Sequence, residues 1–390
     1  MTTQPKGTST RIIHNRRSHK DCNSPFTPIY NTTNFIFDDT QELLDVIDGK
    51  KEGYLYTRWG ANPTILELEQ GLATIEQAER ALAFTAGMAA ISSTIFAHGT
   101  NGVVCLGDLY GGTQAFLNNH LALLGVKVTY LRYEQIDELS THLKPGTVLY
   151  CETPANPTLR LLDLKALADI THQHQALLVV DNTFATPINQ QPLTLGADIV
   201  IHSASKYLGG HSDLTAGAVM ASQALIEPIA AWRKNLGQMI APDTAALLSR
   251  SLRTLPLRMK EHNNKALALA QAMQQHPKIS RVLYPGLPSN PDYKLACSQM
   301  SGFGGMVTIE IKGGRQAAET VANNLKIFLL ATSLGGVESL VSQPVATSHH
   351  AISAEERTKQ GITDGMLRLS VGVEDVADLI ADIEQALASV

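Results

Sequence analysis

A lysine lies just past an apolar run, in the segment His-Ser-Ala-Ser-Lys-Tyr at residues 202–207. A lysine must lose its proton before it can attack an aldehyde, and its ordinary pKa is about 10.4. Burial at the end of a strand, or conversion to a Schiff base, makes such an amine useful to an enzyme. The hydroxyls of Ser203 and Ser205 could bind a phosphate beside Lys206. A surface lysine that opens a turn is the alternative, and the two hydroxyls favour the chemical interpretation.

An aspartate, Asp181, ends the apolar run Leu177–Val180. A carboxylate there could pair with a pyridinium nitrogen and keep the ring cationic, so that the ring accepts electrons from a substrate carbanion. A turn or helix-capping aspartate is the alternative for this residue taken alone. Together, Lys206 and Asp181 predict an enzyme that uses pyridoxal 5′-phosphate as its cofactor.

Two further segments contain groups that could bind a phosphate. Gly87 follows the apolar segment Ala81–Phe84 and begins a predicted helix, whose first backbone amides are free to bind an anion. Arg58 comes two residues after Tyr56 and could grip a phosphate through its planar guanidinium. An ordinary helix start at Gly87 and a loop salt bridge at Arg58 remain open as alternatives.

An arginine near the end of the chain could bind a substrate carboxylate. In the predicted strand Met366–Val371, Arg368 shares one face with Ser370, and the other face is apolar. The alternative is a structural ion pair between Arg368 and Glu374 or Asp375.

Four short apolar runs, at residues 102–108, 147–152, 177–181 and 198–203, show no alternation of apolar and polar residues. Such runs are typical of strands buried on both faces, so we expect a mainly parallel sheet flanked by helices. Ligands gather at the carboxyl ends of parallel strands. We therefore expect one rim to carry the side chains that follow these strands, namely Tyr110, Glu152, Asn156, Asp181, Thr183, Ser203, Ser205 and Lys206.

The length of 390 residues favours more than one hydrophobic core. Residues 1–55 read as an irregular arm, and a helix is predicted to start at Asn62 and Pro63 and to run on to Arg80. Beyond residue 250 the pattern changes to a helix over Met259–Gln275 and strands at residues 279–284, 305–311 and 366–371. We expect an arm (1–60), an α/β domain (61–250) and a smaller C-terminal α+β domain (251–390).

The composition excludes several classes of function. The formal net charge is −5, which gives no electrostatic support for binding nucleic acid. No apolar stretch reaches the roughly 18 residues of a membrane span, and no signal peptide is recognisable, so we expect a soluble cytoplasmic protein. No Gly-rich nucleotide motif occurs, and the histidines lack metal-ligand spacing, so we expect no metal. The four cysteines are too scattered for a disulfide framework; they are Cys22, Cys105, Cys151 and Cys297.

These residues lie in motifs that resemble one family. The motifs occupy residues 56–64, 86–90, 108–113, 152–157, 180–184, 202–213 and 333–339. They are similar to motifs of the transsulfuration enzymes, which include cystathionine γ-synthase, cystathionine γ-lyase, cystathionine β-lyase, methionine γ-lyase and the homoserine sulfhydrylases. The resemblance covers nearly the whole chain. It implies a fold-type-I pyridoxal phosphate enzyme that acts on a small amino-acid substrate, usually as a homotetramer of two active dimers.

The resemblance also implies a role for each site residue. Lys206 would carry the cofactor and shuttle protons, Asp181 would pair with the pyridine nitrogen, and Tyr110 would stack on the ring and act as acid or base. The remaining roles are phosphate binding (Gly87, Met88, Ser203, Ser205), contact with the phosphate of a neighbouring subunit from the arm (Tyr56, Arg58), binding of the substrate carboxylate (Asn156, Ser333, Arg368) and support of the ring (Glu152, Thr183).

Some positions depart from the family pattern. Most γ-synthases and γ-lyases have Glu where this chain has Thr332, which weakens assignment to either. Methionine γ-lyases usually have Cys where this chain has Gly112, which argues against a dedicated methionine-degrading enzyme. The segment Gly60–Asn62 is one residue longer than usual, and the Tyr-containing turn of bacterial β-lyases is absent.

We expect γ-elimination or γ-replacement on sulfur amino acids or activated homoserine, of the cystathionine γ-lyase or γ-synthase type. O-acetyl- or O-succinylhomoserine sulfhydrylase and methionine γ-lyase remain alternatives. More remote alternatives are a binding protein that keeps the fold and the cofactor pocket without turnover, and an α/β protein without cofactor.

Overall fold

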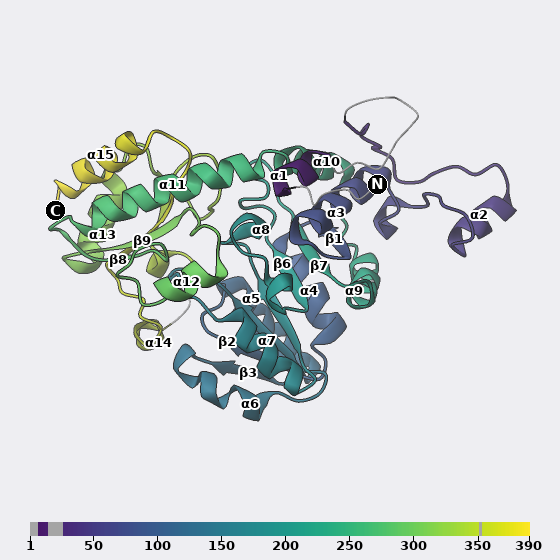
Figure 1. The fold of residues 1–390 in the computed structure, drawn as a ribbon, viewed down its shortest axis with the longest axis horizontal. Helices are drawn as coiled ribbons and strands as arrows, with labels where there is room; N and C mark the ends of the chain where they lie inside the picture. The colour runs from purple at the N-terminus through teal and green to yellow at the C-terminus, as the bar shows by residue number, and fades with distance from the viewer. Residues whose placement is uncertain (1–6, 15–25, 351–352) are drawn as a thin grey trace.

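The computed structural model describes residues 7–14, 26–350 and 353–390. Figure 1 shows two regions of mixed helix and sheet, with a long N-terminal segment that extends away from them. Cys22 lies outside the described residues, whereas Cys105 and Cys151 are buried and Cys297 is exposed, all as free thiols. No helix in the described part of the chain is long and apolar enough to cross a membrane.

The larger region is built on a seven-stranded sheet with the order β1-β7-β6-β5-β4-β2-β3, in which β7 is antiparallel to both of its neighbours. The four predicted apolar runs are strands β2, β4, β5 and β6, so the prediction of a mainly parallel sheet is confirmed. The strands are β1 (Arg80–Phe84), β2 (Val103–Leu106), β3 (Val128–Leu131), β4 (Val148–Glu152), β5 (Leu177–Asp181), β6 (Ile199–His202) and β7 (Gly217–Ala221).

Helices cover both faces of this sheet, which explains why its central strands are apolar throughout. One face packs against α4 (Gly87–His98) and α9 (Gln223–Leu236). The other face packs against α3 (Pro63–Glu76) and α7 (Leu164–Gln173), and α10 (Pro242–Leu252) packs on α3.

Helix α3 begins where the sequence predicts. The side chain of Asn62 accepts a hydrogen bond from the backbone N–H of Thr64, and Pro63 occupies the first helical position. The helix ends at Glu76, because Gln77 adopts a left-handed backbone conformation with φ 59°. The expected continuation to Arg80 was therefore wrong, and Arg80 is instead the first residue of β1.

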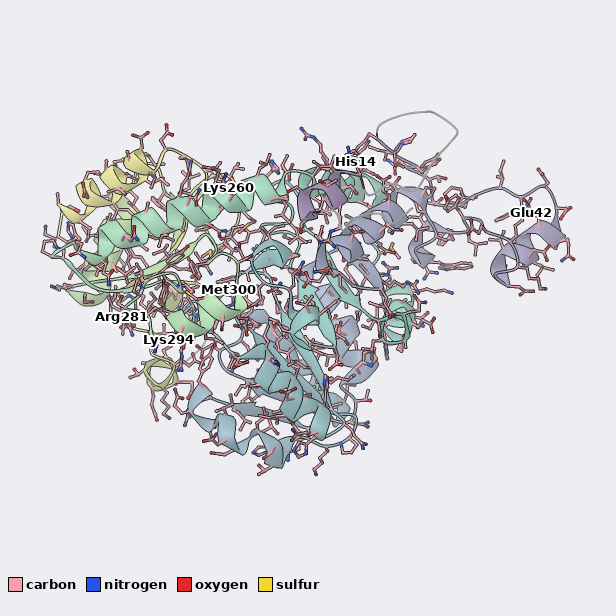
Figure 2. The ribbon with its side chains drawn as sticks, in the orientation of Figure 1. His14, Glu42, Lys260, Arg281, Lys294 and Met300 are labelled. Carbon is pink, nitrogen blue, oxygen red and sulfur yellow. The ribbon has the colours of Figure 1, made fainter. Side chains whose placement is uncertain are left out.

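The N-terminal arm contains more regular structure than expected. Its described residues include two short helices, α1 (Thr8–Ile13) and α2 (Thr40–Ile47), and α2 is capped by Asp39. Helix α2 has no buried residue, and Figure 2 places Glu42, on this helix, far from the two sheets. An isolated antiparallel bridge between Asn34 and Tyr56 closes the segment of the arm that carries α2.

The smaller, C-terminal region contains a five-stranded sheet with the order β10-β11-β12-β9-β8. Its core is formed with α11 (Leu255–Gln274), α13 (Gly314–Asn324) and α15 (Val376–Leu387). The predicted helix and all three predicted strands are present here. The strands are β8 (Ile279–Leu283), β9 (Met306–Ile311), β10 (Leu329–Leu330), β11 (Leu340–Ser342) and β12 (Met366–Ser370).

Short elements complete the described chain. They are the helices α5 (Gly111–Phe116), α6 (Leu139–His142), α8 (Thr186–Asn189), α12 (Tyr293–Gln299) and α14 (Ala354–Lys359), 3₁₀ turns at Thr57–Trp59, Ala122–Leu124, Tyr133–Glu138, Pro192–Leu195 and Pro344–Ala346, and a π-helical turn at Leu117–Leu121.

Candidate active site

A cavity of about 460 Å³ lies at the carboxyl ends of β4, β5 and β6, between the large sheet and loops of the C-terminal region. It brings together every predicted site residue except Tyr56 and Arg58. These lining residues are Gly87, Met88, Tyr110, Glu152, Asn156, Asp181, Thr183, Ser203, Ser205, Lys206, Ser333 and Arg368.

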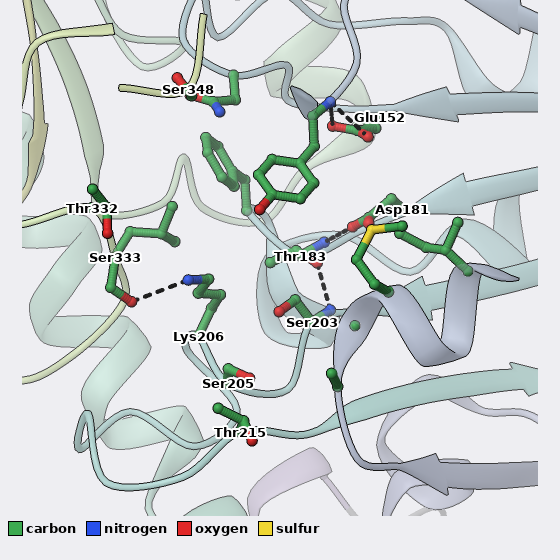
Figure 3. Close-up of a pocket in the computed structure, with 18 of the residues that line it drawn as sticks. Glu152, Asp181, Thr183, Ser203, Ser205, Lys206, Thr215, Thr332, Ser333 and Ser348 are labelled. Carbon is green, nitrogen blue, oxygen red and sulfur yellow. Dashed lines mark hydrogen bonds between the residues drawn. The ribbon is translucent and has the colours of Figure 1, made fainter. Parts of the chain in front are cut away.

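Lys206 points into this cavity from the turn that follows β6 (Figure 3). Its Nζ donates a hydrogen bond to Oγ of Ser333 at 3.0 Å. Burial lowers the pKa of Lys206, and the charge of Arg368 lowers it further. The amine therefore loses its proton more readily than a solvated lysine, as attack on an aldehyde requires.

Two carboxylates lie side by side at the ends of β4 and β5, because Glu152 and Asp181 are partners in the strand register. Both oxygens of Glu152 accept from the backbone N–H of Tyr110 at 3.0 Å, and Oδ1 of Asp181 accepts from the N–H of Thr183 at 2.9 Å. Burial raises the pKa of both carboxyls, and the charge of Asp181 further raises the pKa of Glu152. A cationic ring nitrogen beside Asp181 would offset this accumulation of negative charge.

The N-terminus of α4 forms one end of the cavity. A Cβ atom on Gly87 would lie 2.9 Å from Cβ of Ser203, so glycine allows the first turn of the helix to approach the loop that carries Ser203 and Ser205. Oγ of Ser205 accepts from the backbone N–H of Ala216 at 2.9 Å. Free helix amides next to hydroxyl groups suit a phosphate.

Arg368 enters the cavity from β12 and is 5% exposed. Its Nη1 donates to Oδ1 of Asn156 and its Nη2 to the carbonyl of Ser333, both at 3.1 Å. The alternative of an ion pair with Glu374 or Asp375 is not observed among the described residues, and Glu374 accepts from Ser339 instead. Among the described residues, buried Nε of Arg368 has no partner. A buried guanidinium bound only to neutral groups is suited to an anionic ligand.

Tyr56 and Arg58 lie outside the cavity of their own chain. Both are exposed, and Nη1 of Arg58 donates to the carbonyl of Lys234 at 2.7 Å. The guanidinium of Arg58 also lies 5.7 Å from the centre of the Tyr56 ring. The expected contact with a neighbouring subunit concerns a second copy of the chain and stays a prediction.

The cavity includes residues that the sequence did not single out as site residues. Phe184 is next to the predicted Thr183, and Thr332 is next to the predicted Ser333. Their positions beside predicted site residues could have indicated both. Ser348 comes from an irregular loop and had no such signal. The remaining lining residues are Ala86, Ile91, Pro154, Ser212, Leu214, Thr215 and Leu334. No cluster of His, Cys, Asp or Glu that could hold a metal ion occurs in the described ranges.

Comparisons with known proteins identify the family. A family model described as "Cys/Met metabolism PLP-dependent enzyme" matches residues 9–388. The chain is 42% identical to an L-methionine gamma-lyase of Fusobacterium nucleatum over 100% of both chains. It is 40% identical to a cystathionine gamma-synthase of Mycobacterium bovis over 98% of this chain and 97% of that one.

A solved structure of a related enzyme has the same fold. Cystathionine gamma-lyase from Lactobacillus plantarum, complexed with L-serine, superposes with a TM-score of 0.92 at 36% identity, over 98% of this chain and 99% of that one. The cavity residues fit pyridoxal phosphate, since they include a buried amine, a carboxylate for the ring nitrogen and a helix N-terminus for the phosphate. The chain therefore belongs to the family of pyridoxal phosphate-dependent enzymes of cysteine and methionine metabolism, and it is an enzyme of γ-elimination or γ-replacement chemistry.

Proposed function

We propose that this enzyme removes or replaces the substituent on Cγ of an L-α-amino acid whose carboxylate is bound by Arg368. The main candidate is chemistry of the cystathionine γ-lyase or γ-synthase type. The observation that carries the proposal is the shared cavity of Lys206, an amine with a lowered pKa, and Arg368, a buried guanidinium whose Nε has no partner among the described residues.

The cavity residues divide into a cofactor set and a substrate set. Lys206 would carry the cofactor covalently, and Asp181 would hold the proton on the ring nitrogen. The phosphate would lie against the amides of Gly87 and Met88 and the hydroxyls of Ser203 and Ser205. When bound, pyridoxal phosphate supplies an electron-withdrawing ring that acidifies the Cα proton of an attached amino acid. Glu152 and Thr183 would support the ring, and Tyr110 would cover it and serve as acid or base.

The substrate set positions the amino acid. Arg368 would bind the α-carboxylate, and Asn156 and the carbonyl of Ser333 hold the guanidinium in place for this task. Once substrate is bound, the neutral amine of Lys206 would be free to take the Cα proton and return it at a later step.

A second candidate takes a γ-substituent without charge, as in methionine or O-acetylhomoserine. Of the lining residues, only Glu152 and Asp181 are carboxylates, and both lie at the strand ends beneath the ring site. Position 332 is Thr, so a distal ammonium group such as that of cystathionine finds no counter-charge there. This observation favours a methionine γ-lyase or a homoserine sulfhydrylase.

We also propose a cytoplasmic homotetramer built from two active dimers. Support for the assembly comes from the arm, which exposes Ile36 at 95% and Ile47 at 52% and carries the exposed Tyr56 and Arg58. Exposed apolar side chains on an extended arm are suited to cover a second subunit. The free buried thiols Cys105 and Cys151 agree with a reducing compartment.

The test combines a spectrum with a substrate panel. Purified enzyme loaded with pyridoxal phosphate should absorb near the edge of the visible range, and Lys206→Ala should lose turnover. Ketobutyrate released from cystathionine or methionine would support elimination, and a new thioether from an activated homoserine and a thiol would support replacement. An enzyme that binds no cofactor, or a Lys206→Ala variant with substantial activity, contradicts the proposal.

A further inference from the structure

A serine–histidine pair lies at the edge of the cavity. Ser348 lines the cavity, and its Oγ is 2.8 Å from Nδ1 of the next residue, His349. His349 is only 1% exposed and is not itself one of the lining residues. The hydroxyl of Ser348 therefore lies between the histidine and a bound substrate.

The loop that carries this pair is held against the turn after Tyr110. The backbone N–H of His349 donates to the carbonyl of Pro344 at 2.9 Å. A Cβ atom on Gly111 would lie 2.8 Å from the carbonyl oxygen of Ser348, so the loop and the turn are in close contact. Figure 3 places Ser348 at the opposite end of the cavity from Ser205 and Thr215, away from the proposed phosphate site.

The surroundings of His349 keep its ring neutral. Burial, together with the charges of Arg368 and Arg357, lowers the pKa of His349 to about 4. A neutral imidazole has one N–H and one bare nitrogen. The direction of the bond between Ser348 and His349 follows the tautomer, and a proton on Nδ1 makes the histidine the donor to Oγ of Ser348.

We propose that His349 is a positioning residue: its Nδ1–H donates to Oγ of Ser348 and so directs the Ser348 O–H into the cavity, toward the γ-substituent of the substrate. There the hydroxyl donates to the oxygen or sulfur atom of the leaving group as negative charge develops on it. The histidine also occupies a lone pair of Ser348, so that the serine is a poor acceptor for a distal ammonium group. The inference rests on the proposed γ-chemistry and deepens it.

A double-mutant cycle tests whether His349 acts through Ser348. The variants are Ser348→Ala, His349→Phe and the double variant, each loaded with cofactor and assayed with O-acetyl-L-homoserine and with L-methionine. Loss of one neutral hydrogen bond predicts a fall in kcat/KM of about five- to tenfold for each single variant on the preferred substrate. The double variant should be no slower than the worse single variant, because both changes remove the same interaction.

Two further variants separate positioning from loop packing. His349→Gln keeps a side-chain donor, and Ser348→Thr keeps the hydroxyl, so both should retain kcat/KM within about threefold of the parent enzyme, since either preserves the hydrogen bond. Losses that multiply in the double variant, or a His349→Gln variant as slow as His349→Phe, overturn the inference. Titration with pyridoxal phosphate should give the same affinity for all variants, and a weakened affinity in His349→Phe alone also counts against it.

Failure of the inference is distinguishable from failure of the proposed function. If the parent enzyme shows no γ-activity on any amino acid of the panel, the proposed function is wrong. If the parent enzyme is active and the two losses multiply, γ-chemistry stands and the role of His349 is wrong.

Discussion

A Cβ atom on residue 112 would lie 2.5 Å from Cε1 of Tyr110, so the orientation of this ring depends on Gly112 having no side chain. Tyr110 is 48% exposed and lines the cavity, where the proposal places it over the cofactor ring. Gly112 and Tyr110 are thus coupled in the site, because the Tyr110 ring occupies the space that a side chain at residue 112 would fill.

Replacing Gly112 with Ala should therefore displace the Tyr110 ring. We expect kcat/KM to fall about tenfold, because a misplaced catalytic group loses its productive geometry even when it is moved by little. The absorbance band of the bound cofactor should shift as the ring above it moves. Gly7→Ala is the matched control, since a Cβ atom there meets nothing within 4 Å. A Gly112→Ala enzyme with the spectrum and rate of the parent would show that Tyr110 adjusts freely.

Arg368→Lys should weaken substrate binding. Lysine keeps the positive charge but loses the planar fork that holds Asn156 and faces a carboxylate. We expect kcat/KM to fall about ten- to hundredfold, mostly through KM, because a charge-assisted hydrogen bond is lost. Steady-state kinetics check this. Arg281→Lys is the control, since Arg281 lies on β8 and pairs with Glu310 outside the cavity. An unchanged KM in Arg368→Lys would mean that the carboxylate binds elsewhere.

The sequence predicts the cavity residues at the strand ends of the large sheet better than those in the loops of the C-terminal region. Asp181 and Lys206 each follow an apolar strand, and parallel strands bring such ends together whatever the loops do. Thr332 and Ser348 come from irregular loops of the C-terminal region, where no periodicity marks which residue faces inward. Arg58 lies outside the cavity of its own chain, and its expected contact with a neighbouring subunit stays a prediction.

Secondary structure shows a similar contrast. The start of α3 was predictable because Asn62 and Pro63 are strong local signals for a helix N-terminus. Its end was not, because Gln77 adopts the left-handed conformation that usually marks glycine. Because the apolar residues of β1 follow closely, the apolar pattern predicts a helix that continues into the strand.

The raised pKa of Asp108 makes the free energy of unfolding depend on pH. Burial raises the pKa of Asp108 to about 6, although Thr158 donates to its Oδ2 at 3.1 Å. Because the unfolded chain has the ordinary value of about 3.9, the folded state holds this proton more tightly, and its contribution to stability falls as pH rises from about 4 to about 6. Above that window the buried charge costs on the order of 2 to 3 kcal/mol.

Asp108→Asn removes that cost and keeps an acceptor for Thr158. We expect the variant to unfold at higher denaturant concentration than the parent at pH 8, with a difference that shrinks as pH falls toward 4. Denaturant midpoints at several pH values check this, and activity measured in parallel reports on the nearby Tyr110. A difference that grows on acidification contradicts the raised pKa.

Asn62 joins the arm to the catalytic region, and its two functions can be separated. Its oxygen caps α3, while its Nδ2 donates to the carbonyl of Tyr30 at 2.9 Å and to Oγ1 of Thr57 at 3.1 Å. Asn62→Ser keeps a neutral side-chain oxygen for the cap and loses the amide donor, whereas Asn62→Ala loses all three bonds at a fully buried position. We expect Asn62→Ala to lower the free energy of unfolding by about 2 to 4 kcal/mol, of which about 1 kcal/mol is the lost cap.

The comparison with Asn62→Ser then reports on the arm. If the donations from Asn62 hold the segment around Tyr30 in place, Asn62→Ser should make that segment more open to limited proteolysis, while the unfolding of the rest of the chain changes less than in Asn62→Ala. It should also weaken assembly, because the arm carries Tyr56 and Arg58. Equal protease resistance in Asn62→Ser and the parent would mean that other contacts hold the arm, such as the bond from Tyr30 N–H to Oγ1 of Thr64 at 2.9 Å.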